Sequence, residues 1–436
     1  MRPFAYIVSV TVRAAVLIAA ATVSGCGGSS PSLVVPNPSA PLGLPSPTAA
    51  SQVNTYSGVQ SPGVWSFTLD NAKNLFSYQP VTYPASPNTP VTGSIQIVRG
   101  FTKLQSSGAF AGYALEVMGR IAILRPGGVN VAPVIAVPQT GCYQLAGRSR
   151  FQYAAIPAGL AGSIFGGPTL GYGSVVASTD STGKSWQFED LQGNVVTGPS
   201  SFTGSCGSSN SQAALSFTGV QTVLDDMWAG FAASIPTANT NLSMSIGPSG
   251  FFVADQSDPT QAQPTGASVA GVVEPLAALK TSDIMSQPYL GFVFQAPTAI
   301  GYQGAPATST NTYAVSFGPA SSNGASLTGG DFPNDDVTQS ANSDMSIALG
   351  VQDATFNGLY EGVSITVLDP AQNCANYTGP GETATFGVNA QGYATCTFSG
   401  IAVVGNPESK YGIFISTYNW AARLGGAPME IFLLEQ

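Results

Sequence analysis

An acidic segment, GGDFPNDDVTQSANSD at residues 329–344, holds the densest set of side chains that could bind a metal ion. Calcium takes six to eight oxygen ligands, several of them carboxylates, from a flexible loop. The segment lacks the EF-hand spacing, but it is rich in turn residues and makes calcium the one cofactor that the sequence indicates. The alternative is a solvated acidic loop whose Asp and Asn side chains only form turns. The predicted ligands are Asp331, Asn334, Asp335 and Asp336, with Asp344 close in sequence.

Carboxylates beside an aromatic side chain form a second pattern with chemical meaning. Asp225 and Asp226 precede Trp228, and two acids beside an indole could bind and cleave a sugar. Adjacent residues of a helix point to different faces, so this pair alone is poorly suited to catalysis. A carboxylate-based polysaccharide hydrolase is therefore the alternative function. The remaining acids that could take part are scattered along the chain: Glu116, Glu189, Asp190, Glu274 and Glu361.

The sequence contains no histidine. This excludes Ser-His-Asp and Cys-His catalysis, histidine metal sites and histidine general bases. The Gly-Lys-Ser of STGKSWQF (181–188) lacks the earlier glycine of a P-loop, and GYGSVV (171–176) lacks the third glycine of a dinucleotide loop. We therefore expect no nucleotide cofactor. Four tryptophans could stack on sugars, although aromatic side chains in β-proteins more often belong to the core: Trp65, Trp186, Trp228 and Trp420.

Residues 1–25 have the layout of an export signal. Arg2 and Arg13 supply positive charge, and the apolar run AVLIAAA at 15–21 is followed by small residues. Such a run is shorter than the roughly 20 residues that a membrane-spanning helix needs. The segment therefore indicates a removable signal peptide.

The signal ends in Val-Ser-Gly-Cys at residues 23–26, which resembles the lipobox of bacterial lipoproteins. The resemblance implies that the Cys26 thiol is acylated, that residues 1–25 are removed, and that lipid at Cys26 anchors the chain to a membrane. Each buried CH₂ of such a lipid adds about 0.8 kcal/mol of membrane binding. Gly27 follows in place of the Asp that retains members of this family at the inner membrane. We expect an exported protein at the cell envelope, on the outer membrane or the cell surface.

Four further cysteines are Cys142, Cys206, Cys374 and Cys396. An even number of cysteines in an exported chain predicts two disulfides, for which three pairings exist. Proximity in sequence favours Cys142–Cys206 and Cys374–Cys396.

The charge and composition restrict the class of partner. The chain has 13 basic and 22 acidic residues, and removal of the signal takes away two arginines and no acid. A nucleic-acid partner is excluded because such binding requires basic surface. Only 8% of residues are charged, which is typical of extracellular β-proteins and suits neutral partners such as polysaccharide.

The expected elements are short strands after a spacer. Residues 26–60 are rich in Pro, Ser and Gly, and predict the lipidated cysteine followed by a flexible spacer. From residue 61 onward, alternating apolar runs separated by turn residues predict antiparallel strands. The best helical pattern is 220–235, and the final apolar run, APMEIFLLEQ, is expected to be a strand inside a sheet.

The fold class is therefore all-β, with antiparallel sandwich-like or barrel-like units and a β-propeller as the alternative. Short sequence echoes, such as IAILRP (121–126) with ITVLDP (365–370) and YGSVVAST (172–179) with YGIFIST (411–417), suggest two related halves. Chance similarity among strands is the competing explanation. The expected units are 61–205, a middle β segment with a short helix at 206–305, and 306–436.

In general texture the chain resembles the large uncharacterised lipoproteins of soil bacteria such as acidobacteria. The resemblance depends on the lipobox, the Gly/Ser/Thr-rich strands and the final strand, and it implies no activity. The sequence thus predicts a lipid-anchored envelope protein with a non-catalytic binding or structural role. Its expected partners are the membrane, through Cys26, and a polysaccharide or an envelope protein.

Overall fold

The computed structural model describes residues 53–59, 64–81, 89–127, 133–139, 148–156, 172–179, 185–189, 195–203, 214–215, 217–218, 241–257, 266–295, 311–321, 324–354, 356–368, 385–406, 410–417 and 429–436. All of them belong to one compact unit, Pro47–Gln436. Cys26, the expected signal peptide, Cys142, Cys206, Cys374 and the expected helix 220–235 lie outside these ranges.

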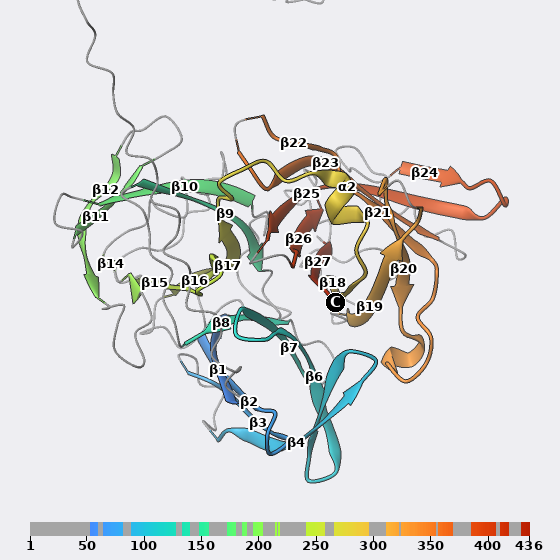
Figure 1. Cartoon of the computed structure of the whole chain (residues 1–436), viewed down its shortest axis with the longest axis horizontal. Helices are drawn as coiled ribbons and strands as arrows, with labels where there is room; N and C mark the ends of the chain where they lie inside the picture. The colour runs from blue at the N-terminus through green and yellow to red at the C-terminus, as the bar shows by residue number, and fades with distance from the viewer. Residues whose placement is uncertain are drawn as a thin grey trace, which may run out of the picture. The chain divides into compact units, whose positions relative to one another are not determined.

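The first eight strands close into an antiparallel barrel, barrel 1 (Figure 1). They follow one another around the ring in chain order, and β1 pairs with β8 to close it. The strands are β1 (Val53–Val59), β2 (Val64–Asp70), β3 (Leu75–Pro80), β4 (Val91–Val98), β5 (Phe101–Ser106), β6 (Ala109–Val117), β7 (Ile121–Pro126) and β8 (Val134–Pro138).

Two-residue turns favour this hairpin-by-hairpin order. Arg99-Gly100 joins β4 to β5 and Ser107-Gly108 joins β5 to β6, and all four residues have positive φ. This is the backbone of a type I′ turn, whose twist matches that of the strands it connects. Glycine at the second position adopts it without strain.

The interior of barrel 1 is filled by side chains of its own strands. Inward and outward positions alternate along each strand, so a single face contributes the interior residues. Tyr56, Phe67 and Leu104 in this cluster have 0% of their surface exposed. The cluster consists of Tyr56, Phe67, Leu69, Phe76, Tyr78, Ile95, Leu104, Ala111, Ala114, Ala122, Leu124, Val134 and Ala136.

A nine-stranded antiparallel sheet follows, in the order β13-β12-β11-β10-β9-β17-β16-β15-β14. Its two end strands, β13 (Ala214–Leu215) and β14 (Phe217–Thr218), are separated in the chain by residue 216 alone. The two ends of the sheet therefore lie close together, although β13 and β14 do not pair with each other. The other strands are β9 (Arg148–Ile156), β10 (Tyr172–Thr179), β11 (Ser185–Glu189), β12 (Val195–Thr203), β15 (Asn241–Ile246), β16 (Phe251–Ser257) and β17 (Gly266–Val273).

The last ten strands form the third sheet. Like barrel 1 it contains a closed ring, because β23 pairs with β25 as well as with β21. The closed ring, barrel 2, has eight strands, and β22 (Val351–Gln352) and β24 (Thr385–Val388) are attached outside it (Figure 1). Its strands are β18 (Tyr289–Gln295), β19 (Asn311–Pro319), β20 (Leu327–Asp331), β21 (Met345–Ala348), β23 (Leu359–Leu368), β25 (Ala394–Gly405), β26 (Gly412–Thr417) and β27 (Met429–Glu435).

A five-residue helix, α2 (Thr281–Met285), packs into the interior of barrel 2. Ile284 and Met285 are both fully buried among side chains that line the barrel, such as Tyr289 and Tyr360. The Tyr289 hydroxyl donates to the Ile284 carbonyl at 2.8 Å, and the Tyr360 hydroxyl donates to the Leu279 carbonyl at 2.6 Å. Burial raises the pKa of both tyrosines, that of Tyr360 to about 12, so both hydroxyls keep the protons that they donate.

One hydrophobic cluster joins the outer faces of both barrels to the nine-stranded sheet. Phe101 of β5 lies 5.9 Å from Phe292 of β18 and 5.5 Å from Phe332, measured between ring centroids. Phe251 of β16 lies 5.7 Å from Phe414 of β26 in the same cluster. Each Å² of apolar surface buried in this shared core stabilises the fold by roughly 25 cal/mol. Separating one sheet from the others would expose that surface, so the core couples the three sheets energetically.

The prediction of an all-β chain with barrel-like units in its two halves is confirmed, and two of the three described sheets close into rings rather than forming propeller blades. The final apolar run is indeed a strand, β27, between β18 and β26.

The expected boundaries differ from those of the sheets. β1 occupies 53–59, inside the expected spacer, because its Ser, Thr and Gly residues hide the alternation that buries Tyr56. The expected unit 61–205 contains seven strands of barrel 1 and four of the nine-stranded sheet, whereas the described strands of 306–436 all belong to the ten-stranded sheet that forms barrel 2. The sequence echoes therefore join strands of different sheets, and these two segments differ in strand order.

Candidate functional site

The acidic segment forms a tight loop after β20. A single 3₁₀ turn, η1 (Pro333–Asp335), begins at a proline, and Asn334 and Asp335 have φ of 53° and 56°. Asn and Asp are the non-glycine residues that adopt this left-handed conformation most readily. The loop turns the Asp335 side chain away from the exposed Asn334 and toward barrel 1.

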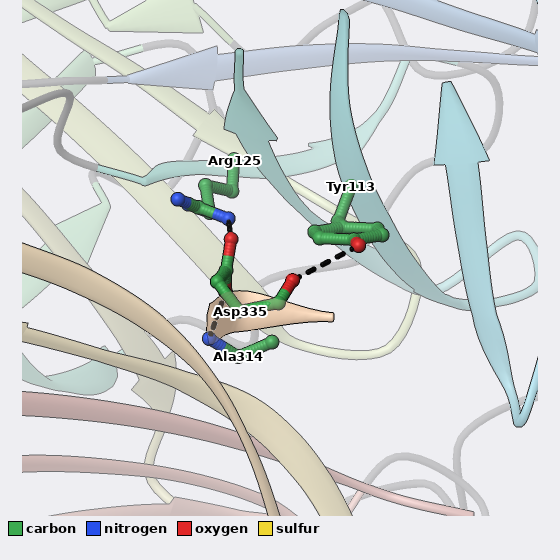
Figure 2. A network of polar contacts seen from close by, with 4 residues as sticks. All are labelled: Tyr113, Arg125, Ala314 and Asp335. Atoms are coloured by element: carbon green, nitrogen blue, oxygen red, sulfur yellow. Dashed lines mark hydrogen bonds and ion pairs between the residues drawn. The ribbon is translucent and has the colours of Figure 1, made fainter. Parts of the chain in front are cut away.

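Asp335 connects the two barrels (Figure 2). One carboxylate oxygen forms an ion pair with the Arg125 guanidinium of β7, and the other accepts from the Ala314 backbone N–H at 3.0 Å. The Tyr113 hydroxyl of β6 donates to the Asp335 carbonyl at 3.1 Å. Arg125 also lies 5.9 Å from the centre of the Tyr113 ring, which is cation–π distance.

This network is largely shielded from water. The side chains of Arg125 and Asp335 are 11% and 20% exposed. Burial raises the pKa of Tyr113, which keeps its hydroxyl in the protonated form that donates. Because both carboxylate oxygens already have partners, the arrangement is suited to joining two barrels rather than to proton transfer or metal binding.

Asp336 and Asp331, two of the other predicted calcium ligands, also have partners of their own. The Asp336 carboxylate accepts from the Thr338 hydroxyl at 2.8 Å and from its N–H at 3.1 Å, and these bonds lower its pKa. Asp331 accepts from the Asn342 side chain at 2.8 Å. Within the described ranges, no three acidic, cysteine or histidine side chains are grouped so that they could hold a metal ion. Turn hydrogen bonds and Arg125 therefore engage oxygens of Asp331, Asp335 and Asp336, and the calcium site stays a prediction.

Glu116 of β6 forms a second polar cluster, at one end of barrel 1. Its carboxylate accepts from the Tyr56 hydroxyl at 3.0 Å, from Asn71 at 3.2 Å and from Asn54 at 3.4 Å. Burial raises the pKa of Glu116, and these three donors partly oppose the shift. A carboxylate that holds three side chains in place is a structural group here.

The remaining predicted residues do not form a common site in the described part of the chain. Glu274 accepts from the backbone N–H of Asn357 at 2.9 Å, and Glu361 is exposed on β23. Trp65 packs against the interior cluster of barrel 1, with its ring 6.1 Å from that of Tyr78. Glu189 and Trp186 are in β11. Asp190, Asp225, Asp226, Trp228 and Trp420 lie outside the described ranges.

Cys396 of β25 is disulfide-bonded. The other cysteines lie outside the described ranges, so the pairing stays a prediction.

The sequence analysis overlooked one surface feature, the β24–β25 hairpin. β24 pairs with β25 from Thr385↔Thr397 to Val388↔Ala394, and it is the last strand of its sheet. Phe386 and Val388 are 48% and 61% exposed. Alternating apolar residues in a stretch without charge could have indicated this hairpin.

No helix in the described ranges has both the length and the hydrophobicity of a membrane span.

Comparison with known proteins gives only distant likenesses. No family model matches the chain, and no curated protein matches it. Transferrin binding protein B from Haemophilus parasuis Hp5, a vaccine-antigen variant, is 8% identical, with a TM-score of 0.29 over 88% of this chain and 76% of that one. Isotype 1 transferrin binding protein B from serogroup B Neisseria meningitidis is 12% identical, with a TM-score of 0.23 over 86% and 66%. A protein of unknown function from Nostoc punctiforme PCC 73102 is 7% identical, with a TM-score of 0.19 over 88% and 94%. These scores are too low to assign a function to this chain.

Proposed function

We propose that this chain is a non-catalytic binding protein of the cell envelope, anchored by lipid at Cys26 and directed at a protein partner. The observation that carries the proposal is that side chains fill the interiors of both barrels, from the strands alone in barrel 1 and from the strands and α2 in barrel 2. A ligand must then be met on the outer surface, at the exposed edges and loops of the sheets. Surface recognition of this kind suits a macromolecule better than a small substrate.

The rigid coupling of the sheets supports the same proposal. Barrel 1 and barrel 2 share a hydrophobic cluster and the Arg125–Asp335 ion pair. A binding surface on either barrel is thereby held in one arrangement before the partner arrives, which lowers the entropic cost of association.

The described carboxylates give the hydrolase alternative no support. Glu116 is held by Tyr56 and two asparagines, and Asp335 is held by Arg125. Neither is positioned to serve as one half of a general-acid and nucleophile pair.

Two experiments test the proposal. In cells grown with an alkyne-labelled fatty acid, the full chain should carry the label and sediment with membranes. The Cys26→Ala variant should lose both properties, and label retained by that variant would contradict the lipid anchor. The purified Cys26→Ala protein should release no reducing ends from a panel of envelope polysaccharides. Release that survives repurification would make the protein an enzyme and overturn the proposal.

A further inference from the structure

We infer that the free edge of β24 is a strand-addition site for an extended, uncharged segment of a protein partner. This inference rests on the proposed binding function and names where and how a partner would attach. Both barrels are closed rings, which have no free strand edges, whereas β24 is attached outside barrel 2 at one end of the ten-stranded sheet.

The register of the hairpin shows which backbone groups face outward. The Asn389 N–H donates to the Tyr393 carbonyl at 2.9 Å, so this pair is hydrogen-bonded. Hydrogen-bonded and non-hydrogen-bonded pairs alternate in antiparallel strands. Gly387↔Thr395 is therefore the next bonded pair, and the N–H and C=O groups of Phe386 and Val388 point away from β25. In the described part of the chain, β24 pairs with no other strand.

The edge lacks the features that natural sheets use to prevent pairing. Such edges carry charges, proline or a bulge, whereas β24 reads Thr-Phe-Gly-Val and pairs with β25 without a bulge. No Asp, Glu, Lys or Arg occurs anywhere between residues 383 and 407. An edge without charge can pair with an uncharged strand without desolvating a charged group on either side, and the new backbone hydrogen bonds compensate the desolvated N–H and C=O groups.

The side chains and the turn make the edge a prepared template. Phe386 and Val388 lie on one face of the hairpin, about half exposed, and could pack against alternate residues of an added strand. Asn389 closes the turn by accepting from the Gln391 and Tyr393 N–H groups at 3.1 and 2.8 Å. Cys396, directly opposite Phe386, is disulfide-bonded, which further restrains the hairpin.

The size of the edge argues for a foreign strand rather than a second copy of this chain. A stable dimer buries at least about 1,000 Å², and two four-residue strands paired edge to edge bury much less. The chain also carries a net charge of −9, which opposes self-association. A partner that inserts one neutral strand and makes further contacts elsewhere avoids both problems.

The test uses a blocked synthetic peptide, acetyl-Ser-Thr-Val-Thr-Val-Thr-Ser-amide, and the full-length Cys26→Ala protein. Backbone N–H exchange is followed by NMR with and without peptide. We expect the amides of Phe386 and Val388 to exchange fast in the free protein and to become at least about tenfold more protected with peptide. A peptide with proline at its central position should give no protection.

Two variants of one residue separate strand addition from other contacts. Val388→Pro removes an outward N–H without touching the β24–β25 ladder and should weaken peptide binding at least about tenfold. Val388→Thr keeps that N–H and the branched shape, and should bind within about threefold of the parent. Equal binding by both variants, or protection of amides elsewhere only, would overturn the inference.

Further readouts distinguish the other occupants. Dimerisation in sedimentation experiments that Val388→Pro abolishes would make a second copy the occupant and contradict a foreign strand. Binding to phosphatidylcholine vesicles that depends on Phe386 would assign the edge to lipid and contradict it also. Neither result alters the lipidation and reducing-end tests, so this inference can fail while the proposed function stands.

Discussion

Glu116 is a residue whose chemistry departs from that of its surroundings. It is a carboxyl group at the end of a barrel otherwise filled with aromatic and aliphatic side chains, held by Tyr56, Asn54 and Asn71. Its raised pKa means that the folded chain binds a proton more tightly there than the unfolded chain does. Protonated Glu116 therefore favours the folded state, and this contribution is lost as pH rises.

The prediction at this scale concerns pH. As pH rises from the ordinary carboxyl pKa of about 4.3 through the raised value of Glu116, the free energy of unfolding should fall. Glu116→Gln, whose amide stays neutral and can keep the same neighbours, should remove that part of the pH dependence in urea unfolding. Glu361→Gln, at an exposed carboxylate, serves as the control. If the free energy of unfolding changed with pH in the same way for the parent and for Glu116→Gln, ionisation of Glu116 would not destabilise the folded state.

Among the elements, α2 shows how a short segment depends on its surroundings. Five residues are too few for an independently stable helix, and α2 exists because Ile284 and Met285 are buried in barrel 2. Its last turn is supported by the Tyr289 hydroxyl, which donates to the Ile284 carbonyl.

Ile284→Ala should lower the free energy of unfolding by about 2–5 kcal/mol, because it leaves a cavity at a fully buried position. Ser282→Ala, on the exposed side of the same helix, should change it by less than about 0.5 kcal/mol. Urea unfolding followed by tyrosine fluorescence measures both. A small effect at Ile284 would mean that α2 is not part of the interior core.

The same scale shows what the sequence could and could not predict. Alternation of apolar residues identified the run VWSFTLD, because a half-buried strand exposes every second side chain. β-branched and aromatic residues identified YGIFIST, whose residues 412–415 are buried on both faces. α2 was not predicted, because five residues are too few to show a helical period. β1 was taken as spacer because its small polar residues resemble a linker. The roles of Asp335 and Glu116 depend on Arg125 and Tyr56, more than 50 residues away in the chain, and no local pattern encodes such contacts.

Across the whole molecule, three sheets behave as parts of one body, because their outer faces share a core. Phe101, Phe251 and Phe292 come from three different sheets and belong to one cluster. Beside this cluster, Arg125 and Asp335 add a partly buried ion pair between the barrels.

Arg125→Met should lower the free energy of unfolding by about 3 kcal/mol, because it leaves the largely buried Asp335 carboxylate without its cation. Adding Asp335→Asn should restore part of that loss, and a double-mutant cycle measures the coupling. If the two changes were simply additive, the ion pair would not join the barrels energetically.

The position of β27 has a consequence for the order of folding. β27 lies between β18 and β26 and shares its ladder with both, so barrel 2 stays an open sheet until residues 429–435 have paired. The pairing of β18 with β27 joins residues that are more than 130 positions apart in the chain, from Tyr289↔Glu435 to Gln295↔Met429. Contacts of such long sequence separation form slowly, because a large loop must close before they stabilise anything. Closure of barrel 2 should therefore be a late step in folding, and until then the edges of β18 and β26 are unpaired and open to aggregation.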